Sequence, residues 1–138
     1  MTVNEVLNYN QIIKSIVDNA PNVNALIKFK LLGMCKQFEP IVENFEKVRQ
    51  DKIREFGTVS GDGNIGIIPP NKDDFEDDND FEKAQEEFNE TVDKFNAAIE
   101  EVAMSEVKVE IEKFKSADIM DAGLPANFLL AIYDLIEE

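Results

Sequence analysis

The chain has 138 residues, of which 43% are hydrophobic and 31% charged, and its formal net charge at pH 7 is −15. This length and balance predict one globular domain with a sizeable core rather than a disordered chain. The sequence has no histidine and a single cysteine, Cys35, which excludes histidine-dependent catalysis, histidine-ligated zinc and an internal disulfide. Carboxylate pairs remain, but their scatter along helix faces is not that of an active-site cleft. We therefore predict a protein that is not an enzyme and binds no cofactor or metal.

The negative charge is concentrated in one part of the chain. Residues 1–56 carry seven acids and eight bases, whereas residues 57–138 carry twenty-two acids and six bases. This distribution disfavours direct contact with nucleic acid or an anionic membrane, and favours a basic protein partner. There is no apolar run long enough to span a membrane and no signal-peptide pattern, so we expect a soluble intracellular protein with Cys35 as a buried thiol.

The N-terminal segment allows two interpretations. Thr2–Leu7 is consistent with a short strand or with a first helical turn, because a threonine followed three residues later by Glu5 is a capping-box pattern. A helix is predicted over Tyr9–Asn19, ended by Pro21.

The longest predicted helix is capped by Asn22, ends at Phe56 and contains Pro40, which is expected to kink it. Its first part, Leu26–Cys35, is apolar on nearly every side, as in a helix packed on several sides. Beyond that part a single apolar stripe remains, formed by Phe38, Ile41, Val42, Phe45, Val48, Ile53 and Phe56.

A second stripe of similar length is formed by Phe81, Ala84, Phe88, Val92, Phe95, Ile99 and Val102. Phe38–Phe56 and Phe81–Ile99 each cover eighteen steps, or about 27 Å of helix. Two stripes of equal length predict a long antiparallel helical hairpin with a phenylalanine-rich seam. The connection between them has β-prone residues on both sides of the turn signal Gly61–Asn64, which predicts a small β-ribbon at the tip.

After the hairpin, strict alternation over Glu106–Ile111 predicts a strand, for which Thr2–Leu7 is the best partner. Ser116 is expected to cap a short helix, and Pro125 to open a last helix with an apolar face reaching Ile136.

The predicted fold is therefore mainly α with minor β. The last helix and the Tyr9–Asn19 helix are expected to cover Leu26–Cys35 and, with one short strand pair, to pack the base of the hairpin. We predict a single domain over residues 1–138, in which residues 1–36 and 103–138 form a globular base and residues 37–102 form the projecting hairpin.

An acidic run opens the second helix of this hairpin and is the candidate interaction patch: Asp73, Asp74, Glu76, Asp77, Asp78 and Asp80. A calcium-binding EF-hand loop is excluded because neither acidic register has glycine at its sixth position. Rows of carboxylates on a rigid helix can imitate nucleic-acid phosphates. They also suit a helix N-terminus, where the dipole favours acids.

In an antiparallel hairpin this run is expected to face a basic cluster of Lys47, Arg49, Lys52 and Arg54. Asp80 or Asn79 is the predicted N-cap of the second helix, which leaves the acids of residues 73–78 without an internal partner.

Much of the chain from about residue 26 resembles a family of small, functionally uncharacterised bacteriophage proteins. The matching portions are LIKFKLLGMCKQFEPIVENFEKVRQDKIREFG, the turn DGN, the helix FEKAQEEFNETVDKFNAAIEEV, the segment VKVEI and the terminal LLAIYDLI. The resemblance implies a phage origin and assigns no residue a role.

Two functions follow as expectations. The first is a non-enzymatic structural, assembly or accessory protein that acts through its helical arm, in the host cytoplasm or in the virion. Its partners would be a virion component, a basic protein or further copies of itself. The alternative is an acidic nucleic-acid mimic that inhibits a host defence or transcription protein.

Overall fold

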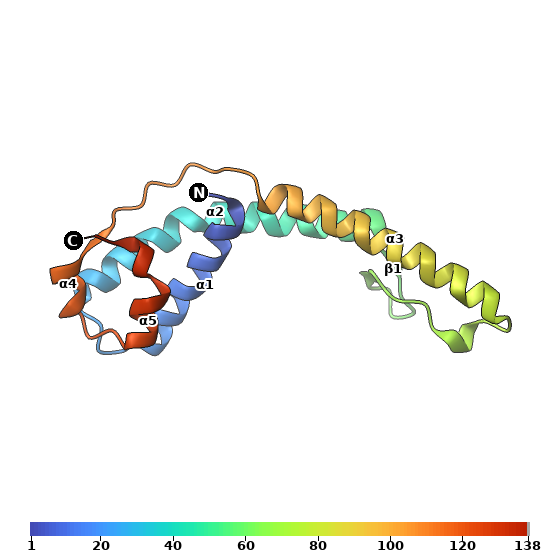
Figure 1. The fold of residues 1–138 in the computed structure, drawn as a ribbon, viewed down its shortest axis with the longest axis horizontal. Helices are drawn as coiled ribbons and strands as arrows, with labels where there is room; N and C mark the ends of the chain where they lie inside the picture. The colour runs from blue at the N-terminus through green and yellow to red at the C-terminus, as the bar shows by residue number, and fades with distance from the viewer. Residues whose placement is uncertain (138) are drawn as a thin grey trace. The chain divides into compact units, whose positions relative to one another are not determined.

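The computed structural model describes residues 1–137. Its helices are α1 (Val3–Asn19), α2 (Ala25–Phe56), α3 (Asp78–Ala103), α4 (Ser116–Met120) and α5 (Ala126–Ala131). There are also two 3₁₀ turns, η1 (Lys72–Asp74) and η2 (Tyr133–Leu135). The strands are two residues long each: β1 (Thr58–Val59), β2 (Ile65–Gly66), β3 (Phe114–Lys115) and β4 (Ile136–Glu137). The mainly α fold with minor β is confirmed (Figure 1).

The described residues form two compact units. Unit 1 contains Met1–Glu43 and the residues from Ser105 onward, and unit 2 contains Asn44–Met104. Helix α2 contributes its first part to unit 1 and its remainder to unit 2.

The hydrophobic core lies in unit 1. α1 buries residues at helical spacing, among them Ile13 and Ile16, because one of its faces is apolar. These side chains pack with residues of α2 and of the C-terminal segments, and the largest fully buried members are Ile27, Leu31, Phe38, Phe114, Ile119 and Ile132.

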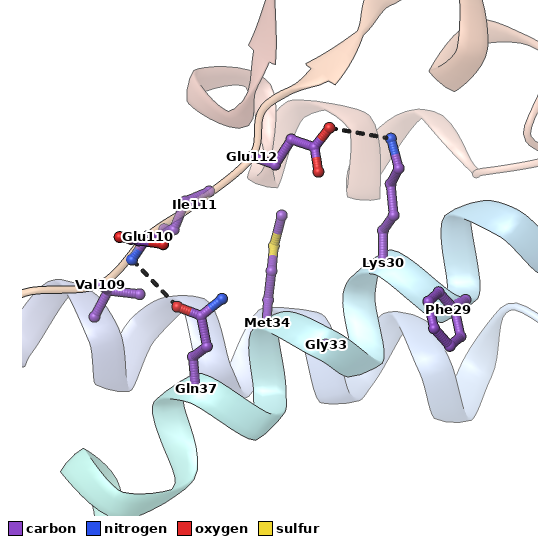
Figure 2. Close-up of a pocket in the computed structure, with 9 residues that line it drawn as sticks. All are labelled: Phe29, Lys30, Gly33, Met34, Gln37, Val109, Glu110, Ile111 and Glu112. Carbon is purple, nitrogen blue, oxygen red and sulfur yellow. Dashed lines mark hydrogen bonds and ion pairs between the residues drawn. The ribbon is translucent and has the colours of Figure 1, made fainter.

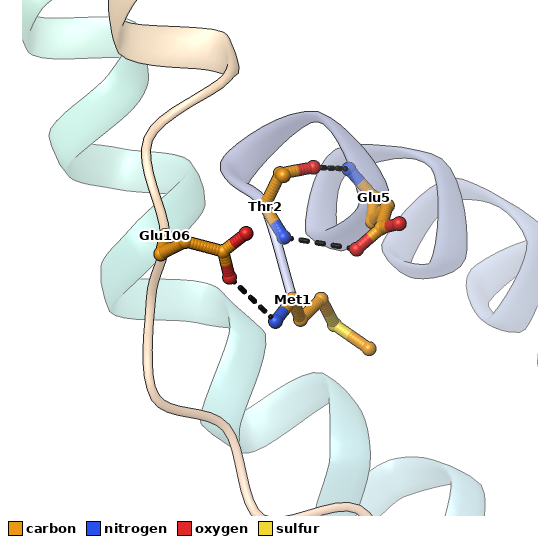
Figure 3. A network of polar contacts seen from close by, with 4 residues as sticks. All are labelled: Met1, Thr2, Glu5 and Glu106. Carbon is orange, nitrogen blue, oxygen red and sulfur yellow. Dashed lines mark hydrogen bonds and ion pairs between the residues drawn. The ribbon is translucent and has the colours of Figure 1, made fainter.

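Helix α1 starts at Val3 rather than at Tyr9, because the capping box forms at Thr2 (Figure 3). The hydroxyl of Thr2 accepts a hydrogen bond from the Glu5 N–H at 3.2 Å, and the Glu5 carboxylate accepts one from the Thr2 N–H at 2.9 Å. The terminal amine of Met1 binds the carboxylate of Glu106 at 3.0 Å, and Thr2 forms an isolated antiparallel bridge with Glu106.

The predicted strand over Glu106–Ile111 is therefore wrong beyond this single bridge. Its expected partner, Thr2–Leu7, is helical from Val3 onward and offers no further strand edge. The strand pair of unit 1 instead joins β3 to β4 in parallel, with Phe114 opposite Ile136.

Two further predictions about the C-terminal segments are wrong. Ser116 is the first residue of α4 rather than its cap, and Lys115 in the cap position makes no side-chain cap hydrogen bond. The last helix, α5, follows Pro125 as expected but ends at Ala131, and the chain continues through η2 into β4 instead of carrying the helix to Ile136.

Helix α2 ends at Phe56, as predicted, and it continues through Pro40. Its start differs from the prediction, because Asn24 rather than Asn22 supplies the cap. The Asn24 side-chain oxygen accepts a hydrogen bond from the Leu26 N–H at 2.8 Å.

Unit 2 contains an antiparallel hairpin of the last part of α2 and α3, with α3 running back along the residues before Phe56 (Figure 1). The predicted β-ribbon in the connection is confirmed: β1 pairs with β2, with Val59 opposite Ile65. Gly63 has φ 86 in its turn, a left-handed conformation that glycine adopts without strain.

The start of α3 does not lie beside the end of α2, as the expected pairing of the acidic run with the basic cluster would require. Phe56 lines a hollow together with Ala84, Phe88 and Thr91, which lie further along α3. The connection between α2 and α3 folds onto α3 here through residues such as Ile67, so the first turns of α3 extend past the end of α2.

Candidate interaction surfaces

The predicted acidic patch consists of exposed residues from two neighbouring elements. Asp73 and Asp74 belong to η1, whose cap is the side chain of Asn71. Asp78 and Asp80 lie in the first turn of α3, where the helix dipole favours negative charge.

Asp77 is the N-cap of α3, which corrects the prediction of Asp80 or Asn79. Its carboxylate accepts a hydrogen bond from the Asn79 N–H at 2.9 Å. Asp77 therefore has an internal partner, contrary to the prediction, although its side chain stays exposed. Next to the cap, the rings of Phe75 and Phe81 meet edge to face with centroids 5.9 Å apart, a favourable aromatic geometry that fixes the start of the helix.

The acidic patch does not pair with the basic cluster of α2, so that prediction is also wrong. Arg49 binds Glu46 at 2.6 Å, Lys52 binds Glu55 at 2.9 Å and Arg54 lies 3.6 Å from Asp51, all within the same helix. Within residues 1–137, no acid between Asn71 and Ala103 takes part in an ion pair. The offset of the two helices explains this, because the start of α3 lies beyond the end of α2.

A second carboxylate is held in the turn of the ribbon. Asp62 accepts hydrogen bonds from the Ser60 hydroxyl and from the backbone and side-chain N–H groups of Asn64. These hydrogen bonds lower the pKa of Asp62 below its ordinary value, and the bond from Ser60 has the largest effect. These hydrogen bonds stabilise the turn of the ribbon. The described part of the chain holds no group of three carboxylate or thiol side chains placed to bind a metal.

The seam of the hairpin is only half covered. Six of the ten phenylalanines of the chain lie in unit 2, and all six are partly buried: Phe45, Phe56, Phe75, Phe81, Phe88 and Phe95. No residue between Asn44 and Met104 is fully buried. Two helices and a ribbon therefore leave each of these rings partly exposed.

A further surface, which the sequence reasoning missed, lies on the first part of α2. The prediction that Leu26–Cys35 is packed on all sides is wrong: Leu26 is 60% exposed, Phe29 75% and Leu32 47%. The opposite side of the same helix buries Ile27, Leu31 and Met34 in the core. We call Leu26, Phe29, Leu32 and Gly33 the outer face of α2.

An open hollow of about 600 Å³ adjoins the outer face, lined by Lys14, Phe29, Leu32, Gly33, Cys35, Lys36 and Glu39. Cys35 is half-buried rather than buried, and this partial burial raises the pKa of its thiol, an effect that the charge of Lys14 opposes. The thiol is therefore protonated at neutral pH and is a weak nucleophile.

A second hollow, of about 760 Å³, lies on the other side of Phe29 and Gly33, between α2 and the segment Val109–Glu112 (Figure 2). Two contacts cross it: the Gln37 side-chain oxygen accepts a hydrogen bond from the Glu110 N–H at 3.2 Å, and Lys30 lies 4.0 Å from Glu112. Met34 points between them (Figure 2). The side chain of Gln37 thus supplies one hydrogen bond to the main chain of this segment, which forms no strand.

Comparisons with protein-family models, with curated proteins and with solved structures find no match for this chain. The resemblance to phage proteins therefore stays a prediction. None of the helices in the described residues is both long enough and apolar enough to cross a membrane.

Proposed function

We propose that the protein is a non-enzymatic interaction protein that binds a protein partner through unit 2. The observation that carries this proposal is that all six phenylalanines of unit 2 stay partly exposed, in a unit without a single fully buried residue. A partner that covers the seam removes this apolar surface from water, which contributes about 25 cal/mol for each Å² buried.

The charge of unit 2 defines the chemistry of the partner. Residues 71–103 carry thirteen acids and three bases, and none of these acids has an ion-pair partner among residues 1–137. A partner surface with apolar side chains edged by lysine or arginine is therefore complementary.

The resemblance to bacteriophage proteins supports a structural, assembly or accessory role, in the host cytoplasm or in the particle. The test is a photo-crosslinking amino acid placed at exposed Glu87 or Glu90 of unit 2, with Asp118 of unit 1 as the control position, in infected cells. We expect Glu87 and Glu90 to crosslink one particle or assembly protein and Asp118 to give none. Crosslinks from Asp118 alone, with particles free of the protein by mass spectrometry, would contradict the proposal.

The unpaired acids also favour a second candidate, an acidic inhibitor of a basic nucleic-acid-binding protein. Asp73, Asp74 and Glu76 are suited to its test because none of them caps α3, unlike Asp77. For this candidate, reversal of these three charges to lysine abolishes binding to the basic host protein, and added salt weakens wild-type binding steeply. Binding that survives the reversal excludes the inhibitor.

A further inference from the structure

The segment between α3 and β3 has the side-chain pattern of a strand but no strand beside it. Every second residue packs against the core of unit 1, namely Val107, Val109 and Ile111. The residues between them are exposed: Lys108, Glu110 and Glu112. This alternation is that of an extended chain with one covered face. The segment is therefore held in place as a strand would be, and the core alone holds its covered face.

The main chain of this segment has one edge without hydrogen bonds. In an extended chain, successive N–H groups point to opposite edges. The N–H of Glu110 points to α2, where the side chain of Gln37 accepts its hydrogen bond (Figure 2). The N–H and C=O groups of Val109 and Ile111 belong to the opposite edge and form no hydrogen bond within residues 1–137. We call these groups the free edge.

A short pairing precedes the free edge. The C=O of Met1 accepts a hydrogen bond from the N–H of Val107 at 2.9 Å, next to the antiparallel bridge between Thr2 and Glu106. This side of the segment therefore already accepts an antiparallel neighbour. No described residue continues the pairing beyond Val107, where the free edge begins.

The segment also lacks the features that protect exposed strand edges. Natural edges are interrupted by proline or bulges, or carry charges on their inward positions. Residues 105–115 contain no proline or glycine, and the inward positions are apolar. The charges of the segment are exposed and of both signs, so they do not repel every possible neighbour.

We propose that the free edge pairs with the free edge of a second copy of this chain, antiparallel and around a two-fold axis at Glu110. Val109 of each copy then lies opposite Ile111 of the other, and their N–H and C=O groups bind each other. A second copy is the favoured occupant because it has the same prearranged edge. One symmetric contact thus satisfies the free groups of both chains. The hydrogen bonds to Met1 and Gln37 are kept.

The exposed side chains fit this register. With Glu110 at the axis, Lys108 of each copy lies opposite Glu112 of the other, so opposite charges meet at both ends of the pair. Glu112 lies 4.0 Å from Lys30 of its own chain, but its side chain is 83% exposed and can contact Lys108 as well. The two Glu110 carboxylates face each other at the axis and are the one unfavourable pair.

Neighbouring registers fit less well. An axis at Ile111 would place Glu110 opposite Glu112 at both ends, which opposes like charges twice. An axis at Val109 would require Ile111 of the second copy to occupy the position of Met1. The axis at Glu110 avoids both conflicts.

The test of this register uses two variants of exposed residues, Lys108→Glu and Glu112→Lys. Each variant places like charges at both ends of the pair, whereas a mixture of the two restores opposite charges at both ends. Circular dichroism establishes that the variants are folded, and sedimentation equilibrium measures association of the full chain. We expect wild-type protein to form dimers and each variant alone to associate about tenfold more weakly. An equimolar mixture should recover dimers of wild-type affinity.

Glu110→Gln is the variant expected to change association in the opposite direction. It removes the unfavourable pair at the axis and keeps the main-chain hydrogen bond to Gln37. Dimers of this variant should be about two- to fivefold tighter than those of wild type. Weaker association would contradict the axis at Glu110.

Hydrogen exchange of the wild-type protein, followed by NMR, tests the edge itself. As the protein concentration rises, exchange of the N–H groups of Val109 and Ile111 should slow. The N–H groups of Lys108 and Glu112 lie on the other edge and are the matched controls, whose exchange should not change.

Three results would overturn the inference: a wild type that stays monomeric, a mixture that associates no better than its components, or equal protection of both edges. The proposed function is tested separately, because every residue of the free edge belongs to unit 1. A monomeric wild type whose unit 2 still crosslinks a partner overturns the strand pairing and leaves the proposed function standing.

Discussion

At the level of single residues, the glycines show how differently one residue type is used. Gly33 lies in a helix interior with open space around it, whereas Gly123 has φ 78 and an added Cβ would lie 2.5 Å from the carbonyl oxygen of Asn22. The first glycine is unnecessary for the fold of unit 1 and the second is required by it.

Gly33→Ala is therefore expected to raise the free energy of unfolding by about 0.5–1 kcal/mol, because alanine restricts the unfolded chain and favours the helix. Gly123→Ala is the matched control and should lower it, since alanine is strained at positive φ and collides with the main chain at Asn22. Urea unfolding of both variants measures the difference. A destabilising Gly33→Ala would show that the space beside it is filled within the monomer.

The pKa of Glu46 lies well below its ordinary value. Hydrogen bonds from Arg49 and then Gln50 lower its pKa from 4.5 to about 2. Because this pKa is lowered, the contact stabilises the folded chain at pH values above the ordinary pKa of 4.5. The stabilisation is lost as the pH falls from there toward 2. Because the pair is exposed, its effect on stability is small.

We expect Arg49→Gln to return the pKa of Glu46 toward 4.5. A carboxyl-carbon NMR titration of Glu46 gives the value directly. Lys52→Gln, which removes a base of the same helix that pairs with Glu55 instead, should leave the titration of Glu46 unchanged.

At the level of elements, side-chain caps decide where the three long helices begin. Thr2, Asn24 and Asp77 each accept a hydrogen bond from the N–H two or three residues further on. In each case a different start was expected from the sequence or was left open. Asparagine and aspartate occur at several neighbouring positions before α2 and α3, and pattern alone does not choose among equivalent caps.

Asp77→Ala is expected to lower the free energy of unfolding by about 1 kcal/mol, the usual cost of a lost cap. Glu76→Ala removes the same charge one residue earlier, where no cap hydrogen bond is made, and should have little effect. Chemical unfolding followed by circular dichroism compares the two. Equal effects would mean that charge near the helix end, rather than the cap, supplies the stability.

The sequence predicted where helices and strands occur better than it predicted which of them pair. The helix end at Phe56, the ribbon around Gly61–Asn64 and the mainly α class were recovered, because local signals specify them. The strand predicted over Glu106–Ile111 is not found. Alternation indicates which side chains face the core, but it does not show that a neighbouring strand is present. Val107, Val109 and Ile111 do pack against the core, from a segment without strand pairing.

At the level of the whole molecule, full burial is confined to unit 1. Its core side chains, such as Phe38 and Phe114, are 0% exposed, while the phenylalanines of unit 2 remain partly open to water. An apolar stripe in the sequence predicts a buried face but not how completely it is covered. For this reason the exposure of Leu26, Phe29 and Leu32 on α2 and the partial exposure of the seam could not be predicted from the sequence.

Phe38→Ala is expected to cost about 3–5 kcal/mol, because it empties a closed core. Phe88→Ala should cost clearly less, since its side chain is only half-buried and water can enter the space. Denaturant unfolding of both variants, with hydrogen exchange to assign the affected unit, measures the contrast. Equal costs would show that the seam is as closed as the core.

The segment that Gln37 contacts has few main-chain hydrogen bonds, which affects how easily a protease can cut it. From Lys108 to Glu112, the N–H of Glu110 is the one main-chain group with a hydrogen bond among the described residues. Lys108, Glu110 and Glu112 are exposed, and the segment has almost no main-chain hydrogen bonds, so a protease can bind it more readily than a helix. Trypsin should therefore cut first after Lys108 or Lys113, and Gln37→Ala should speed that cut, as intact-mass analysis of a timed digest would show. The one hydrogen bond from Glu110 to Gln37 would then limit how readily this segment opens to a protease.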